Sequence, residues 1–126
     1  MKAKYKLFCL FFSFFLLSGC DYPNEKYAIN LGKKRAEKHL TAPKFSNVFV
    51  MEESNSSKDD FKGYVCGHAD FKDMHGNYNG FPLRFFVKTA ITKSGSNTNI
   101  STSNFTLEPL SDNEWFEKKW QMYCIK

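Results

Sequence analysis

Five side chains that can bind a ligand fall within nine residues near the middle of the chain: Asp70, Lys72, Asp73, His75 and Tyr78. Together they supply hydrogen-bond donors and acceptors and both signs of charge. If the chain turns between them, they can converge on one ligand and form a binding loop. The glycines and asparagines in this stretch suit a plain hairpin equally well, with positive φ at the turn and polar side chains facing water. The sequence leaves both interpretations open.

The other chemical groups do not form a catalytic or metal-binding pattern. His68 and His75 are seven residues apart across an expected strand and turn, which is not a known ligand spacing. Asp59 and Asp60 lie in a polar segment without the apolar surroundings that acid–base catalysis needs. The chain has no nucleophile elbow, no zinc-protease helix motif and no phosphate-binding loop. We therefore expect no enzymatic activity, no metal and no bound cofactor.

The N-terminal segment has the layout of a signal peptide. It begins with three cations, Lys2, Lys4 and Lys6. An apolar run of eleven residues follows, Leu7 to Leu17, interrupted only by Ser13. A membrane-spanning helix needs about 20 such residues. The run therefore has the length of a signal-peptide core rather than of a retained transmembrane helix.

The run ends in Leu17-Ser18-Gly19-Cys20, which resembles the lipobox of bacterial lipoproteins. The resemblance implies cleavage between Gly19 and Cys20, and a diacylglycerol and an N-acyl chain such as palmitate on Cys20. More than one chain gives stable attachment to a membrane. Asp21 resembles the residue that retains enterobacterial lipoproteins in the inner membrane, which would place the mature domain in the periplasm. An ordinary secretory signal is the alternative.

Processing of this kind changes the charge and the cysteine count. Loss of residues 1–19 leaves 107 residues and lowers the net charge from +5 to +2, so the basic character does not indicate nucleic-acid binding. Cys9 is removed and Cys20 is lipidated, which leaves Cys66 and Cys124 in an oxidising compartment. We expect them to form a disulfide. It would close a loop of about 59 residues and stabilise the fold by roughly 4 kcal/mol. A reactive or metal-binding pair has no supporting spacing.

A short lipidated tether over residues 20–24 leads into one expected domain over residues 25–126. Its first element is a helix over Glu25–Leu40, capped by Asn24 and ended before Pro43. The helix is rich in cations: Lys26, Lys33, Lys34, Arg35 and Lys38. These side chains either face solvent or lie against anionic phospholipid headgroups beside the anchor.

Four segments rich in β-forming residues follow: Ser46–Met51, Gly63–Phe71, Phe81–Thr92 and Thr98–Leu107. Polar and glycine-containing turns separate them over Glu52–Asp60, Lys72–Gly80 and Lys93–Asn97. Short connections between successive strands predict an antiparallel meander, in which each strand pairs with the next one in the sequence.

The last element is a helix that starts from a capping box at Ser111 and Glu114 and runs to about Tyr123. Trp115 and Trp120 fall on its apolar stripe, where they either pack on the sheet or form a platform for a ligand. The expected fold class is α+β, with an N-terminal helix, a four-stranded antiparallel meander, a C-terminal helix and one disulfide. We expect both helices to cover one face of the sheet.

The segment from Pro43 to Phe85 is similar to small bacterial and phage proteins that carry Cys-Gly-x-Val-Asn-x-Lys-Asn, then Gly-Gly-Tyr-x-Gly and a phenylalanine. The matching residues are Cys66, Gly67, Lys72, Gly76, Tyr78, Gly80 and Phe85. The departures are Ala69, Asp70, Asp73 and Asn77. The resemblance implies a strand–turn–strand unit with a disulfide, and it implies no activity.

The small size of the domain and its predicted location at the membrane favour a membrane-anchored lipoprotein that binds another envelope protein. Small anchored domains of this kind are similar to the immunity, superinfection-exclusion and entry-exclusion lipoproteins of mobile elements. One alternative is an inhibitor of a periplasmic hydrolase such as lysozyme. Another is a lipoprotein that binds a small ligand or a metal through His68, His75 and the acidic residues between them.

Overall fold

The computed structural model describes residues 23–53 and 60–125. The expected signal peptide over residues 1–19, the lipidation site Cys20 and the sorting residue Asp21 lie outside the described residues. The elements follow in the order α2 (Pro23–Glu37), β1 (Thr41–Glu52), β2 (Phe61–Lys72), β3 (Leu83–Ser94), β4 (Asn97–Leu107) and α3 (Glu114–Cys124).

The strands form one antiparallel sheet in the order β1-β2-β3-β4, so each strand pairs with its neighbour in the sequence. Cys66 in β2 forms a disulfide with Cys124 at the end of α3, with 6.0 Å between their Cα atoms. The expected α+β fold, with a helix at each end of a four-stranded meander and one disulfide, is confirmed.

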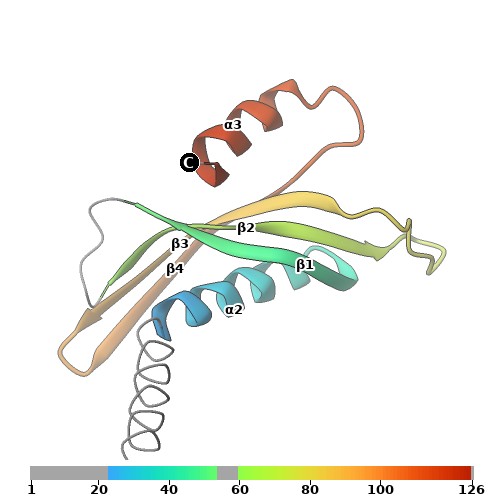
Figure 1. Cartoon of the computed structure of the whole chain (residues 1–126). Coiled ribbons are helices and arrows are strands. Elements are labelled where there is room, and N and C mark those ends of the chain that lie inside the picture. The colour runs from blue at the N-terminus through green and yellow to red at the C-terminus, as the bar shows by residue number, and fades with distance from the viewer. Residues whose placement is uncertain (1–22, 54–59, 126) are drawn as a thin grey trace, which may run out of the picture.

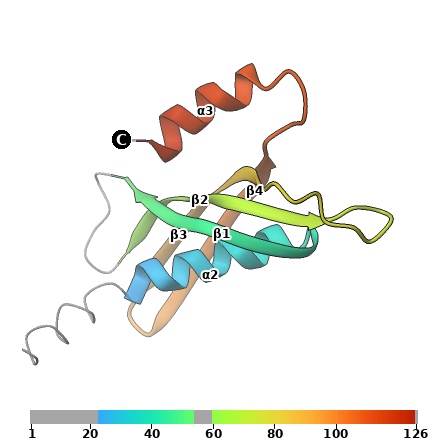
Figure 2. The ribbon, with the colours of Figure 1, turned by 45° about the vertical axis from the view of Figure 1, so that its right-hand side comes forward.

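The two helices cover opposite faces of the sheet, with α2 on one side and α3 on the other (Figures 1 and 2). The expectation that both helices cover one face is wrong. The reason lies in the central strands, where the consecutive residues Val65 and Cys66 are both buried, as are Phe85 and Phe86. Because consecutive residues of a strand point to opposite faces, each face needs its own cover.

The face under α2 holds an aliphatic and phenylalanine core. Its buried residues are Ala28, Ala36, Leu40, Phe61, Val65, Ala69, Phe85, Val87 and Ile91. The helix approaches β2 closely, since a Cβ added at Gly32 would lie only 2.6 Å from a methyl group of Val65. Gly32 weakens the helix as a local signal, and this close packing explains why a glycine stands there.

The face under α3 holds an aromatic core around the disulfide. Its buried residues are Cys66, Phe86, Phe116, Trp120 and Cys124. Trp120 is 5% exposed and packs on the sheet, whereas Trp115 is 47% exposed on the outer side of the helix. The two tryptophans of the expected stripe therefore have different surroundings, and only Trp120 belongs to the core.

Both helices differ from expectation at their ends. The described helix α2 includes Asn24, so this residue lies inside the helix rather than before it. Helix α3 begins at Glu114, its N-cap residue is Asn113, and no side chain caps it. The expected capping box at Ser111 is therefore wrong. Asp112 has a φ of +51°, which turns the chain there, and the Asn113 amide donates to Glu108 at 3.4 Å instead.

The two edge strands differ in regularity. In β1 the pairing with β2 shifts twice, between Thr41 and Lys44 and again between Ser46 and Phe49. Strand β1 starts five residues before its expected first residue, Ser46. The other strands begin and end within two residues of expectation. The opposite edge, β4, carries no charged residue and no proline.

Candidate functional site

The β2–β3 loop, residues 73–82, extends beyond the end of the sheet (Figure 2). An isolated antiparallel bridge between Lys72 and Tyr78 closes its base. Gly76 and Gly80 have φ values of 82° and 89°, a conformation that other residues rarely adopt. The turn predicted from the glycines is therefore present, and four of the five predicted binding residues lie in it or at its base.

The two carboxylates of the predicted binding loop bind its own backbone. One oxygen of Asp73 accepts hydrogen bonds from the N–H groups of residues 75 and 77, at 2.9 and 3.0 Å. Asp70 accepts from the N–H groups of residues 79 and 80, at 3.3 and 3.0 Å. Both carboxylates therefore fix the loop conformation, as in an Asx turn.

Tyr78 joins the loop to β1. Its hydroxyl donates to the carbonyl of Ala42 at 2.8 Å. The ammonium groups of Lys44 and Lys72 lie 4.0 and 5.7 Å from the centre of its ring. The structure thus brings Lys72 and Tyr78 together, while His75 lies exposed. Among the described residues, no group of three His, Cys, Asp or Glu side chains is placed to hold a metal.

The loop exposes two large apolar side chains. Met74 is 92% exposed and Phe81 is 61% exposed. Apolar side chains on a loop whose backbone is already fixed can bury against a partner with little loss of chain entropy. This combination is better suited to contact with another protein than to binding of a small polar ligand.

An arginine that the sequence did not single out joins α3 to the sheet. Arg84 in β3 lies 2.9 Å from Glu108, which follows β4, and 2.7 Å from Glu117 of α3. Its guanidinium also lies 5.2 Å from the ring centres of both Phe116 and Trp120. The alternation of β3 places Arg84 on the same face as Phe86, and that pattern was the available signal.

The charges of this junction stabilise one another. The hydrogen bond from Arg84 holds the pKa of Glu108 below its usual value, and the same donor lowers the pKa of Glu117. The hydrogen bond to Glu108 in turn raises the pKa of Arg84. These shifts come from pairing between protein groups, so the junction has a structural role.

His68 also lies under α3, away from the β2–β3 loop. Its ring centre is 6.1 Å from that of Trp120, and its Nδ1 atom is buried without a hydrogen-bond partner among the described groups. Nearby, Tyr64 stacks on Tyr123 at 4.2 Å, and burial raises the pKa of Tyr64 to about 12. His68 and the exposed His75 thus have different surroundings, and the structure does not join them into one site.

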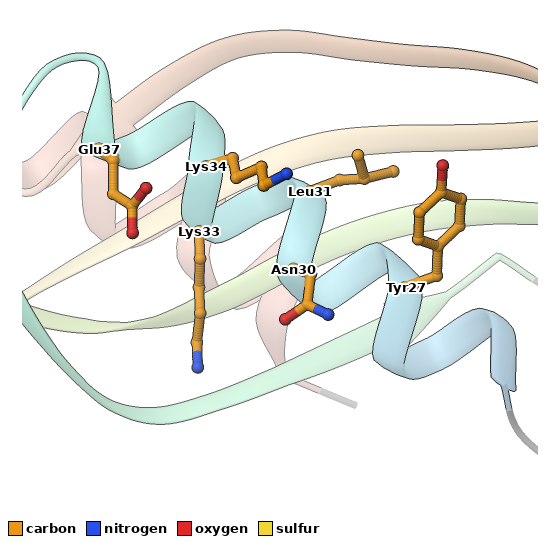
Figure 3. A pocket seen from close by; sticks show the side chains of 6 residues that line it. All are labelled: Tyr27, Asn30, Leu31, Lys33, Lys34 and Glu37. Atoms are coloured by element: carbon orange, nitrogen blue, oxygen red, sulfur yellow. The ribbon is translucent and has the colours of Figure 1, made fainter.

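A hollow of about 290 Å³ lies on the outer side of α2. Figure 3 shows the side chains that line it: Tyr27, Asn30, Leu31, Lys33, Lys34 and Glu37. All come from one helix, so the hollow is open to solvent. It offers a phenol, an amide and two ammonium groups against a single carboxylate, which favours an anionic occupant.

Comparison with protein-family models, with curated protein sequences and with solved structures gives no match to this chain. In the part of the chain that the structure describes, no helix has both the length and the hydropathy needed to cross a membrane.

Proposed function

We propose that this protein is a membrane-anchored lipoprotein of the bacterial envelope that acts by binding another protein. The type is that of immunity, superinfection-exclusion or entry-exclusion lipoproteins. Cys20 carries the lipid, and Asp21 holds the protein in the inner membrane of an enterobacterial host. The proposal assigns no catalytic residue and no cofactor.

The observation that carries the binding role is the β2–β3 loop. Its backbone is fixed by Asp70 and Asp73, and it presents Met74 and Phe81 to solvent. Protein interfaces derive most of their affinity from a few apolar or aromatic anchors that become fully buried. A loop already held in one conformation loses little entropy on binding.

Two observations support the address. The leader has the three zones of a signal peptide and ends in the lipobox pattern at Cys20. The Cys66–Cys124 disulfide suits an oxidising compartment such as the periplasm.

The anchor is tested by replacing Cys20 with serine. The full chain is expressed in cells fed radioactive palmitate, and membrane and soluble fractions are separated. We expect label and membrane attachment for the native chain, and neither for Cys20→Ser. A chain that stays unlabelled yet mature would instead indicate an ordinary secretory signal.

The binding role is tested by photocrosslinking from the loop in intact cells. A photoreactive amino acid at Met74 should give one discrete adduct with an envelope protein. The matched control is the same amino acid at Met122, which is also exposed, at 69%, but lies on α3. Phe81→Ser in the Met74 chain should abolish the adduct.

A functional assay then asks what the bound protein does. Cells that express the native chain are challenged with phage and with conjugating donors. Protection that Phe81→Ser removes and Met122→Ser leaves intact would support the proposed type. Adducts of equal strength from Met74 and Met122, or protection insensitive to both substitutions, would contradict a role for the loop.

A further inference from the structure

We infer that the outer side of α2 docks on the anionic phospholipid surface that holds the anchor. This inference rests on the proposed lipidation of Cys20. It adds a second contact between protein and membrane, which fixes how the domain sits on the bilayer. The occupant is the headgroup layer of the bilayer itself.

The outer side of α2 combines lysine, tyrosine and other polar side chains. Tyr27, Asn30, Lys34 and Glu37 follow at intervals of three or four residues and therefore share one side of the helix. They line the hollow described above, together with Lys33 (Figure 3). Lysine and tyrosine side chains are suited to the boundary between headgroups and water.

The cations on and next to the outer side of α2 are available to an anionic surface. Lys26, Lys34 and Lys38 are exposed, and their side chains form no ion pair with any described residue. Residues 25–38 carry five cations and two carboxylates, a net charge of +3. These cations are therefore available to lipid phosphate groups. Lysines near a membrane surface are attracted to any leaflet that contains anionic lipids.

The other side of the molecule lacks a comparable excess of cations. Residues 108–124, which include α3, carry four carboxylates and two lysines, a net charge of −2. Arg84, which pairs with two of these carboxylates, and Lys88 lie on the same face and offset that charge. Because α2 and α3 cover opposite faces of the sheet, the excess of cations lies on one side of the molecule (Figure 1). An anionic surface therefore attracts the α2 side more strongly than the α3 side, which turns α2 toward the bilayer.

The proposed anchor at Cys20 is close to α2 in the sequence. Three residue steps separate Cys20 from Pro23, the first residue of the described helix. An extended chain covers at most about 11 Å in three steps. That is close to the screening length of about 10 Å at moderate ionic strength. Helix α2 therefore starts within the electrostatic field of the lipid surface.

The test uses the lipidated full chain in vesicles and measures the depth of two positions. With Cys20 lipidated and the other two mature cysteines in the disulfide, an introduced cysteine is the only free thiol. Asn30→Cys places a fluorophore on the outer side of α2, and Gln121→Cys places one on the exposed side of α3. Lipids with a nitroxide on the headgroup quench a fluorophore only at close range.

We expect strong quenching at position 30 and weak quenching at position 121 in vesicles that contain phosphatidylglycerol. Quenching at position 30 should fall at least about threefold in 0.5 M salt or in neutral phosphatidylcholine vesicles, because screening removes the attraction. Lys26→Gln with Lys34→Gln should have the same effect. The matched control is Lys88→Gln with Lys118→Gln, which removes the same charge elsewhere and should leave quenching unchanged.

Three results would overturn the inference. Equal quenching at positions 30 and 121 shows that α2 does not face the bilayer. Quenching at position 30 that is independent of lipid charge and salt shows that the short tether alone holds α2 near the surface. A protein that fails to float with the vesicles lacks the anchor, which rejects the proposed function and this inference together and is read directly from the flotation step.

Discussion

At the scale of residues, Arg84 has the largest set of side-chain contacts described above. One guanidinium pairs with Glu108 and Glu117 and lies over Phe116 and Trp120. The side chains of Arg84 and Glu108 are only about one-fifth exposed, so their charges are largely removed from water. Loss of one partner would leave the other charge poorly solvated.

Replacing Arg84 with methionine keeps the length and the apolar contact with the rings but removes the charge. We expect the free energy of unfolding at pH 7 to fall by about 2 kcal/mol, because the Glu108 carboxylate loses its partner. Urea denaturation measures this change. Lys88→Met, on the same strand and exposed, is the control and should change stability by less than about 0.5 kcal/mol.

The same pair gives a pH dependence with a defined sign. The folded state lowers the pKa of Glu108, so its contribution is complete above the unfolded value of about 4.3 and is lost as pH falls through the lower folded value. The stability gap between the native chain and Arg84→Met should therefore narrow from about pH 5 downward. A gap that stays constant from pH 7 to pH 3 would show that the ion pair is not its source.

The loop carboxylates make a second prediction at this scale. Asp73→Ala removes the acceptor for the N–H groups of residues 75 and 77. Amide hydrogen exchange at these two positions should rise about tenfold, while global stability changes by about 1 kcal/mol or less. His75→Ala, in the same loop, leaves the acceptor in place and should leave the exchange rate of the residue 77 amide unchanged.

At the scale of elements, the sequence predicts the interiors of strands and helices and loses their edges and faces. The β-forming residues and turn glycines located β2, β3 and β4 to within two residues. The first part of β1 contains Pro43, and Ala42 and Asn47 have positive φ, so its local sequence does not mark it as a strand. Its extent is decided by pairing with β2, which is a non-local interaction.

The placement of the helices on opposite faces could have been predicted from adjacent apolar residues in the central strands. Phe85 and Phe86 are adjacent, so a strand that buries both must be covered twice. The predicted loop residues were the right residues for a turn, but their use of Asp70 and Asp73 as backbone acceptors depends on the loop geometry. Arg84 pairs with Glu108, which lies 24 positions later in the sequence, and with Glu117, which lies 33 positions later. No local sequence pattern predicts such pairs.

Helix α2 gives a packing prediction. Gly32→Ala would place a methyl group 2.6 Å from Val65 in a buried contact, so the Val65 side chain or the helix must shift. We expect a loss of about 1–3 kcal/mol in the free energy of unfolding, although alanine favours a helix. Asn30→Ala on the outer side of the same helix should be neutral or stabilising. Thermal unfolding of both variants separates packing from propensity.

Helix α3 depends on the disulfide. Reduction of the Cys66–Cys124 bond should lower the free energy of unfolding by about 2–4 kcal/mol. Exchange of the α3 amides should rise before that of α2, because α3 is held by one aromatic layer and the Arg84 pairs. The oxidised protein in the same buffer is the control. Protection of α3 that survives reduction would show that the aromatic layer alone holds it.

At the scale of the whole molecule, the sheet separates two unlike sides. The α2 side is basic and follows the proposed anchor, and the α3 side exposes Leu110, Trp115 and Met122. A domain held by α2 on a bilayer would present α3 to the periplasm and the β2–β3 loop at its flank. The loop and α3 would then both remain accessible to envelope proteins.

If the chain is exported as proposed, the nearest-neighbour order of the strands has a consequence for assembly of the sheet. An exported chain leaves the translocon from its N-terminal end, and each strand here pairs with the strand that emerged just before it. The sheet can therefore assemble during translocation without waiting for distant segments. The exception is Cys66, whose partner lies 58 residues later. In an exported chain its native partner would become available only after α3 has crossed, so formation of the Cys66–Cys124 bond would follow completed translocation.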